Sequence, residues 1–476
     1  MNRTKIVATI GPACSTRDIL IKLGDAGVSV CRLNLSFGDY ASHLKTLGAI
    51  RSASKKLGRP LGVLMDLQGP KIRVGQLPEP FKMENGEFVV LSGHQKTKKP
   101  NHIPTTYAKI ASDTKKGKTI LLADGRISLK VVKTVPEKRE VHCVVLNGGT
   151  ILTGKGINLP DTNVSLPALT PKDRRDAKFG LEAGVDFMGL SFVRRPEDVL
   201  DLRRLMKRAG REIPIIAKIE KPEAVSTLDA ILDTVNGVMV ARGDLAVEIS
   251  FAKVPRVQKE IIRAANKKGK HTIVATEMLS SMTENPRPTR AEASDVANAV
   301  LDGADAVMLS NETSVGKHPV LAVKAMSGIV AEAEKMLDDK FYHQPLDLPE
   351  THEMTESMCA AASFLSNHLD EKALAVITHS GRTARILSKY RPDSVIFAGT
   401  FDPNVYNMLS ILHNVEPILL DPRLFDSEEA TAASVKSFIR LLSKRKLARK
   451  GDKIVFLVGN IQNNGWKVDD IKVAIV

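Results

Sequence analysis

Short runs of β-branched and other apolar residues alternate with longer amphipathic stretches of helical period through the first two thirds of the chain. This alternation predicts βα units and a parallel sheet. Eight strands with intervening helices are typical of a TIM (β/α)8 barrel. The eight runs are KIVATI from Lys5, VSVCRLNL from Val28, LGVLMDL from Leu61, DFMGLSFV from Asp186, IPIIAKIE from Ile213, GVMVAR from Gly237, HTIVATE from His271 and DAVMLSN from Asp305.

The regular spacing breaks once, between the third run and the fourth, where a long segment replaces the usual helical crossover. From about Val74 to Leu166 this segment is rich in Gly, Pro and Lys. It carries short strand-like runs such as EFVVLS, TILLADG, ISLKVV and EVHCVVL. We expect a small inserted β-barrel or sandwich that emerges from the strand ends and acts as a lid.

After about Leu337 the composition shifts through FYHQPLDLPE into a third unit. A helical stretch from Thr355 to Leu369 is followed by the strand-like runs ALAVITHS, SVIFAGT, VEPILLD, DKIVFLVG and IKVAIV, which alternate with helices. This pattern predicts an open α/β sheet. The predicted units are therefore the barrel at 1–72 and 168–340, the lid at 73–167 and a C-terminal α/β domain at 341–476.

Polar residues end several of the predicted barrel strands, which is where barrel active sites lie. Lys218 and Glu220 are two residues apart on one strand, so their side chains point to the same side. Asp244 ends the next strand behind Gly243. A cation and two carboxylates at strand ends suit phosphoryl chemistry with a divalent metal. The alternative is a buried structural ion pair. Other polar strand ends are Thr9, Arg32, Asn34, Asp66, Ser191, Thr276 and Ser310.

The charge balance narrows the ligand class. There are 69 lysines and arginines against 54 acidic residues, a net charge of +15, which suggests phosphates or, less specifically, nucleic acid or a membrane surface. Aromatic residues make up only 4%, a poor supply for base stacking. The four cysteines lack CxxC spacing, so we expect neither a disulfide framework nor zinc. With no leader pattern and no apolar run of membrane-spanning length, we expect a cytoplasmic protein that binds no membrane and no specific nucleic acid.

A second candidate anion site lies in the C-terminal unit. The segment THSGRT joins a strand to a helix start, where hydroxyls, backbone amides and a guanidinium can hold a phosphate. Its candidate residues are Thr378, Ser380, Arg382 and Thr383. A plain helix N-cap explains Thr378 and Ser380 equally well.

Nine ordered segments together resemble the signatures of one family, pyruvate kinase, in its bacterial, potassium-independent subgroup. The resemblance runs from Lys5 to about Pro392 and is far more specific than a lone glycine motif. It implies transfer of the phosphoryl group of phosphoenolpyruvate to ADP, giving pyruvate and ATP. The segments are KIVATIGPAC, CRLNLSFG, MDLQGPKIR, GKGINLP, IIAKIEKPEA, VMVARGDLAVE, ATEMLSSM, NPRPTRAEASDVANAVLDGADAVMLSNET and SGRTARILSKYRP.

The resemblance implies roles for residues of the barrel. Arg32 and Lys218 match phosphate-handling positions, with Lys218 stabilising the transition state. Glu220 and Asp244 match ligands of Mg²⁺, which Mn²⁺ can replace. Thr276 matches the threonine beside the carbon that is protonated, through a relayed water.

Further positions follow from the same resemblance. The amides of Gly243 and Asp244 would bind the substrate carboxylate. Asn34, Arg73 and Lys155 match nucleotide contacts, although a solvated loop also explains Lys155. Ser310 belongs either to the proton relay or to a cap on the loop after the eighth strand.

One departure from the family concerns potassium. The family's monovalent-cation site matches Asn34, Ser36, Asp66 and the Leu67 carbonyl, and members that need K⁺ carry a glutamate where this chain has Lys71. An ammonium group there would occupy the electrostatic place of K⁺. We therefore expect that K⁺ is not required.

Four other departures leave their effects open. Phe37 replaces a histidine, Ala246 and Asn311 replace glycines, and Glu277 replaces a glutamine. If Glu277 points inward, it should raise neighbouring pKa values or weaken substrate binding; if it faces Arg290 or another basic residue, it should have no effect.

The family also implies a homotetramer, and an effector at the C-terminal unit. This chain has NIQNNGWKVDD, without the threonines, where sugar-phosphate-responsive members have a Gly- and Thr-rich loop. The expected effector is therefore a sugar monophosphate or a nucleotide rather than fructose bisphosphate, and the alternative is a site that no longer binds an effector. Two other functions compete with the leading one. They are a Mg²⁺-dependent enolpyruvate lyase or aldolase, and a catalytically degenerate phosphate-ligand or nucleic-acid-binding relative. The intact set Arg32, Lys218, Glu220, Asp244 and Thr276 argues against degeneracy.

Overall fold

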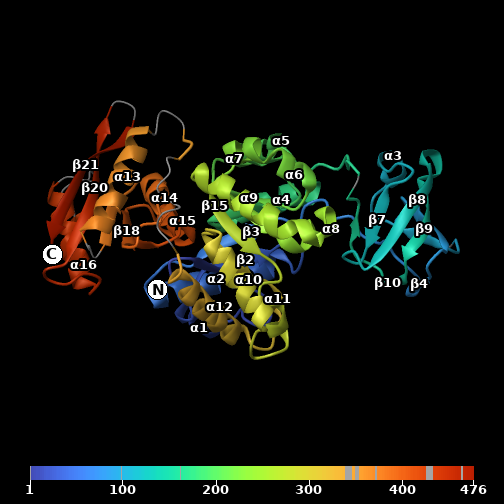
Figure 1. The fold of residues 1–476 in the computed structure, drawn as a ribbon, viewed down its shortest axis with the longest axis horizontal. Helices are drawn as coiled ribbons and strands as arrows, with labels where there is room; N and C mark the ends of the chain where they lie inside the picture. The colour runs from blue at the N-terminus through green and yellow to red at the C-terminus, as the bar shows by residue number, and fades with distance from the viewer. Residues whose placement is uncertain are drawn as a thin grey trace.

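The computed structural model describes residues 2–97, 99–160, 162–337, 346–348, 353–369, 373–424, 432–462 and 465–476. A central barrel is flanked by a β-rich lid at one end and an α/β domain at the other (Figure 1). The predicted linker FYHQPLDLPE falls largely outside the described residues, as do residues 463–464 of the segment NIQNNGWKVDD. Among the described residues, no helix is both long and apolar enough to cross a membrane.

All eight predicted runs form parallel strands of one closed barrel, which confirms the predicted fold. The strand order around the barrel is β1-β16-β15-β14-β13-β12-β3-β2, so β3 and β12 pair across the long insertion. The strands are β1 (Lys5–Thr9), β2 (Val28–Asn34), β3 (Gly62–Asp66), β12 (Phe187–Leu190), β13 (Ile215–Ile219), β14 (Gly237–Ala241), β15 (His271–Ala275) and β16 (Ala306–Leu309).

Helices cover the outside of the barrel. They are α1 (Arg17–Asp25), α2 (Tyr40–Leu57), α4 (Pro171–Ala183), α5 (Pro196–Arg208), α6 (Pro222–Ser226), α7 (Leu228–Thr234), α8 (Arg242–Ile249), α9 (Val254–Lys267), α10 (Arg290–Leu301), α11 (Asn311–Ser314) and α12 (Pro319–Glu334). Several of them, among them α4, α5, α6, α9 and α12, carry Pro in the first turn, where its missing N–H costs nothing.

The alternation of side chains along each strand decides which residues point into the barrel interior. Every strand contributes an apolar side chain to one buried cluster, for example Val30, Leu64 and Ile216, which is only feasible inside the ring. Because side chains alternate along a strand, residues two and four positions further on point inward as well. Lys218 and Glu220 follow Ile216 in this way, so they lie on the interior above the apolar layer, at the carboxyl end.

The lid is β-rich, as expected. Its strands form a six-stranded sheet in the order β11-β7-β8-β9-β5-β6 and a separate two-stranded ribbon of β10 and β4, a half-barrel rather than a closed ring. Arg194 of the barrel donates to the carbonyls of Val164 and Leu166, which fastens the returning chain. The elements are β4 (Phe81–Met83), β5 (Phe88–Ser92), β6 (His102–Pro104), α3 (Ile110–Asp113), β7 (Thr119–Leu122), β8 (Ile127–Val135), β9 (Glu140–Asn147), β10 (Gly149–Ile151) and β11 (Ile157–Asn158).

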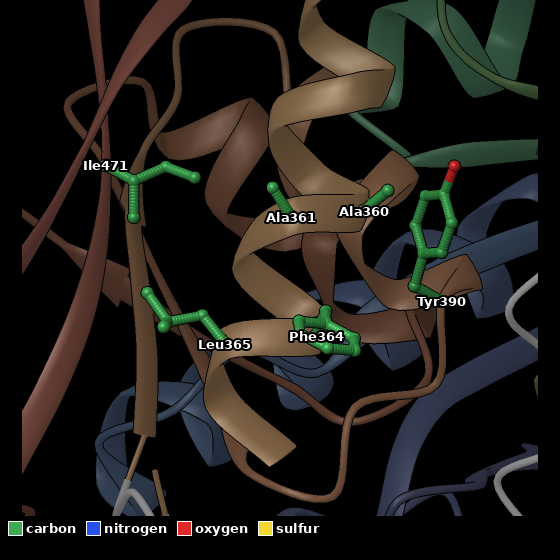
Figure 2. A pocket seen from close by; sticks show the side chains of 6 residues that line it. All are labelled: Ala360, Ala361, Phe364, Leu365, Tyr390 and Ile471. Atoms are coloured by element: carbon green, nitrogen blue, oxygen red, sulfur yellow. The ribbon is translucent and has the colours of Figure 1, made fainter. Parts of the chain in front are cut away.

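The C-terminal domain is an open five-stranded sheet in the order β19-β18-β17-β20-β21, with β21 antiparallel to β20. Its strands are β17 (Ala373–Ile377), β18 (Val395–Thr400), β19 (Val415–Leu419), β20 (Lys453–Gln462) and β21 (Gly465–Ile475). Its helices are α13 (Glu353–His368), which matches the predicted helical stretch, α14 (Arg382–Lys389), α15 (Pro403–Met408) and α16 (Ala432–Lys444). An apolar groove beside α13 is lined by Ala360, Ala361, Phe364, Leu365, Tyr390 and Ile471 (Figure 2).

Buried ion pairs seat this domain on the barrel. Lys389 and Arg391 approach Asp305, just before β16, at 2.5 and 2.9 Å. Lys5 donates to the Val415 carbonyl at 2.9 Å. Asp305 and Lys5 both lie where barrel strands begin, so the C-terminal domain covers the end of the barrel opposite the lid.

Candidate active site

Four charged side chains meet inside the carboxyl end of the barrel. Lys218 Nζ lies 2.9 Å from Glu220 Oε1 and 3.4 Å from Asp66 Oδ2. Arg32 donates two hydrogen bonds to the same Asp66 oxygen, at 2.8 and 2.6 Å. Arg32 and Lys218, expected to handle phosphate, are therefore held side by side by one carboxylate.

The buried charges shift one another's pKa values. Burial alone would lower the pKa of Lys218, but the carboxylates of Asp66 and Glu220 raise it above the usual value, so the ammonium stays charged. Burial would raise the pKa of Asp66, but Lys218 and Arg32 hold it below its usual value. The pKa of Glu220 is raised, first by burial and further by the nearby charge of Asp244.

The two predicted metal ligands come from neighbouring strands. Asp244 lies in the first turn of α8, after β14, and its charge raises the pKa of Glu220, which directly follows β13. Glu220 Oε1 is buried and lies 2.9 Å from the Lys218 ammonium group. Two carboxylates that repel each other from neighbouring chain segments fit a hard divalent cation such as Mg²⁺. Because Mg²⁺ commonly takes one or two carboxylates plus substrate oxygens and waters, the fit does not need the three-residue His, Cys, Asp or Glu group that is absent from the described residues.

Thr276 is held in a strained backbone conformation beside Gly243. Its φ of 71° lies in the left-handed region, which β-branched residues rarely adopt. Gly243 donates its amide to the Thr276 hydroxyl at 2.7 Å, and Arg242 donates to the Thr276 carbonyl at 2.8 Å. These contacts support the strain, of the kind that concentrates at functional sites. The Gly243 amide, expected to bind the substrate carboxylate, is thus bonded to Thr276 here.

Two further residues of the site carry weaker sequence signals. Ser191 was one of the polar strand ends, and its hydroxyl accepts from Lys218 at 2.8 Å and donates to the Leu67 carbonyl at 2.7 Å. The backbone amide of Phe192 donates to Glu220 at 2.9 Å. Ser191 could be recognised in the sequence as a polar strand end. Phe192 could not, because a backbone amide donor does not depend on residue type.

The expected nucleotide residues lie at the entrance and on the lid. Arg73 donates to the Gly154 carbonyl at 2.9 Å, which ties the lid hinge to the loop that carries Lys155. Lys155 is exposed, as both the nucleotide and the solvated-loop interpretations require. Asn34 closes β2, where its side chain accepts from the Ser36 amide at 3.0 Å.

Lys71 lies 3.3 Å from Asp244 Oδ1. Among the described residues, no hydrogen bond or ion pair joins it to Asn34, Ser36, Asp66 or Leu67, the expected cation-site positions. The ammonium group therefore stands beside a predicted metal ligand.

The departures from the family occupy different environments. Glu277 is exposed, and within the described part of the chain it has no ion pair with Arg290. Phe37 is 71% exposed, Ala246 is buried in α8, and Asn311 begins α11. Pairing of Glu277 with Arg290, one of the expected orientations, is therefore not formed among the described residues.

Ser310 and the THSGRT segment contradict the capping explanations. The Ser310 hydroxyl is buried and makes no hydrogen bond with the described residues, so it caps nothing. The N-cap of α14 is Gly381, in the left-handed region at φ 76°. Neither Thr378 nor Ser380 is therefore the cap, although the Thr378 hydroxyl accepts from the Gly381 amide at 3.0 Å. Ser380 and Arg382 are exposed, and Thr383 is half-buried.

Comparison with known proteins gives one consistent result. The family models described as pyruvate kinase, barrel domain, and pyruvate kinase, alpha/beta domain, match residues 1–323 and 356–474. Pyruvate kinase 2 of Synechocystis is 40% identical over 477 residues, which span 100% of this chain and 79% of that relative. The Mycobacterium intracellulare pyruvate kinase is 43% identical over 459 residues, 96% of this chain and 95% of that relative. The crystal structure of a pyruvate kinase from Cryptosporidium parvum aligns with a TM-score of 0.92 at 36% identity, covering 100% of this chain and 96% of that one.

Proposed function

The chain belongs to the pyruvate kinase family and transfers the phosphoryl group of phosphoenolpyruvate to ADP, giving pyruvate and ATP, and we propose that the charges buried at the barrel mouth carry this reaction. The observation behind the proposal is the position of Lys218, between Glu220 at 2.9 Å and Asp66 at 3.4 Å. A cation fixed this firmly is preorganised for charge that develops during transfer. Neither the lyase alternative nor the nucleic-acid-binding alternative gains support from the comparisons.

Phosphoryl transfer needs positioning and electrostatic stabilisation more than covalent chemistry. We assign Arg32 to the substrate phosphate, because its guanidinium forms forked contacts with oxyanions. Lys218 places a positive charge beside the equatorial oxygens of the phosphoryl group in the transition state. Asp66 holds both cations in place.

Glu220 and Asp244 are the proposed ligands of Mg²⁺ or Mn²⁺. Such a cation, when bound, polarises phosphoryl and enolate oxygens as a Lewis acid. The protein's part is to present one buried and one half-buried carboxylate that follow adjacent strands, with the Phe192 amide orienting Glu220. The backbone amides of Gly243 and Asp244, at the N-terminus of α8, bind the substrate carboxylate. The Gly243 amide must then exchange its hydrogen bond to the Thr276 hydroxyl for one to the substrate.

The enolpyruvate that remains must take a proton at carbon. A threonine hydroxyl is too weak an acid to be the sole source, so we place Thr276 in a relay that includes water. The Ser310 hydroxyl, buried without a protein partner among the described residues, suits the same relay. ADP lies between barrel and lid, against Asn34, Arg73 and Lys155.

Lys71 is the basis for proposing activity without K⁺. Its ammonium group pairs with Asp244 at 3.3 Å, so it supplies a fixed positive charge beside a proposed metal ligand, and this charge would replace the electrostatic contribution of K⁺. The variant Lys71→Glu should acquire a requirement for K⁺, while the wild type should respond little to KCl at constant ionic strength. A large rise in wild-type rate with KCl would refute this part.

We also propose a homotetramer with an effector site in the C-terminal domain, working in the cytoplasm. The apolar groove beside α13 supports assembly, since Phe364 is 59% exposed there (Figure 2). Thr378, Ser380, Arg382 and Thr383 remain the proposed contacts for an effector phosphate, from a sugar phosphate or a nucleotide. All four cysteines are buried free thiols, which suits a reducing compartment.

The experiment that tests the assignment is ATP formation from phosphoenolpyruvate and ADP with Mg²⁺, with and without K⁺, beside Glu220→Ala. We expect wild-type turnover that the variant loses and that does not depend on K⁺. Turnover by Glu220→Ala near the wild-type rate would remove Glu220 from the metal site. No turnover by the wild type, with or without sugar phosphates and nucleotides, would refute the proposal.

A further inference from the structure

A second buried polar cluster lies behind the active site, where the lid meets the barrel. Asn158, at the end of β11 in the lid, donates its side-chain amide to Glu248 Oε1 at 2.9 Å. Lys221 of the barrel donates to the same oxygen at 2.6 Å. The Glu248 side chain is 1% exposed, and its other oxygen accepts no hydrogen bond from the described residues. A buried carboxylate is costly unless it is paired, so both contacts matter to its position.

Each member of this cluster stands beside a residue already assigned to a ligand. Lys221 directly follows Glu220, and Glu248 lies four residues after Asp244 on α8, one helical turn away on the same face. The ion pair between Lys221 and Glu248 thus joins the two chain segments that carry the two proposed metal ligands. Asn158 adds a third segment to the cluster.

That third segment carries the nucleotide contacts. Asn158 comes three residues after Lys155 in the strand that returns from the lid. Val74 of the hinge donates to the Lys155 carbonyl at 2.8 Å, and Arg73 donates to the Gly154 carbonyl at 2.9 Å. The same loop also approaches Lys71: a Cβ at Gly156 would lie 3.7 Å from Lys71 Cε. The nucleotide loop is thus one short strand away from Glu248.

We propose that Glu248 is a positioning residue which, through Asn158 and Lys221, couples ADP binding at the lid to divalent-metal binding by Glu220 and Asp244 in the barrel. ADP bound at the lid would hold the loop that carries Lys155, and with it the existing contact between Asn158 and Glu248. That contact fixes α8, and with it the carboxylate of Asp244. Metal binding, acting through the same helix, favours the lid position that ADP needs, because such coupling is reciprocal. The inference rests on the proposed assignment of Lys155 to ADP and of the two carboxylates to the metal.

The test replaces Asn158 by leucine in the full-length protein. This change leaves the Lys221 to Glu248 pair in place, so the buried carboxylate keeps its counter-ion and the fold is preserved. Asn147→Leu is the control, because the side-chain amide of Asn147 donates, among the described residues, to the Arg126 carbonyl within the lid. Calorimetric titration measures ADP affinity with and without Mn²⁺, and Mn²⁺ affinity with and without ADP. Binding of Mn²⁺ to ADP in solution is common to all variants and cancels in the comparison.

We expect Mn²⁺ to strengthen ADP binding to the wild type and to Asn147→Leu, and Asn158→Leu to lose at least about fivefold of that gain, the lower end of usual coupling factors. Mn²⁺ affinity without ADP should match the wild type in all three. In steady state, Asn158→Leu should raise KM for ADP more than it lowers kcat.

Two results would overturn the inference. One is an Asn158→Leu variant that behaves as Asn147→Leu does. The other is a loss of ADP affinity that is equal with and without Mn²⁺, since the contact would then only fasten the lid. Two controls separate this failure from a failure of the site assignment: ADP binding by Lys155→Ala, and ATP formation by the wild type. Neither control depends on Asn158.

Discussion

Replacing Lys218 by methionine removes the ammonium group between two buried carboxylates. Arg32 still pairs with Asp66 at 2.6 Å, so Glu220 is the carboxylate left without its nearest cation. Leaving a buried charge unpaired typically costs about 3–5 kcal/mol. We therefore expect Lys218→Met to lower the melting temperature of the barrel by about 10 °C.

The catalytic loss should be similar in free energy to this structural loss. Removing one preorganised stabilising group typically lowers kcat by about a thousandfold, equivalent to about 4 kcal/mol in activation free energy. Lys218 Nζ is 2.8 Å from the Ser191 hydroxyl and its side chain is only 12% exposed, so water cannot easily replace it. Binding of Mn²⁺ should persist, since both proposed ligands remain.

The assay is pyruvate formation coupled to NADH oxidation, run well below the melting temperature of every variant, with Mn²⁺ binding measured separately. Lys218→Arg is the control: it keeps the positive charge, so its melting temperature should stay near that of the wild type while its different head group slows transfer. If Lys218→Met keeps more than a tenth of wild-type kcat, Lys218 is not the transition-state stabiliser. If its melting temperature is unchanged, the ion-pair energy has been overestimated.

Three other predictions follow from the same structure. Thr276→Ala should slow exchange of solvent deuterium into the pyruvate methyl group by about a hundredfold and ATP formation by less; equal losses would contradict a role confined to proton transfer. Burial, with Lys389 and Arg385 nearby, lowers the pKa of His271 to about 3. Between about pH 6.5 and pH 3 the unfolded chain therefore binds a proton at His271 that the folded chain does not bind, and the free energy of unfolding should fall by about 1.4 kcal/mol per pH unit as the pH is lowered. His271→Gln should make the melting temperature less dependent on pH. An unchanged dependence of melting temperature on pH would contradict the assignment. Phe364→Asp should lower the molar mass measured by light scattering; a mass equal to that of the wild type would exclude the α13 groove as a subunit contact.

Much of the fold could be predicted from local patterns. Runs such as KIVATI from Lys5 and GVMVAR from Gly237 are mostly apolar, without strict alternation, because parallel strands are covered on both faces. The same periodicity correctly placed Lys218 and Glu220 on one side of their strand. The break in spacing indicated the lid, although its open half-barrel shape depends on which strands pair. The capping explanations for Ser310, Thr378 and Ser380 were wrong because hydroxyl orientation at a turn depends on backbone angles that residue type does not specify.

The sequence by itself determined the eight barrel strands, the inserted lid, the C-terminal sheet and the inward direction of the charged strand ends. The strands, the helices between them and the direction of the strand-end side chains follow from repeats of two or about four residues. The lid follows from the one break in the spacing of the strands. Only the tertiary structure decided which of those side chains meet: Asp66 between Arg32 and Lys218, Lys71 against Asp244, and Asn158 against Glu248. These partners come from distant segments and are brought together by closure of the barrel, with β3 paired to β12 across the insertion. No short-range period carries that information, because it depends on the strand order and register of the whole ring.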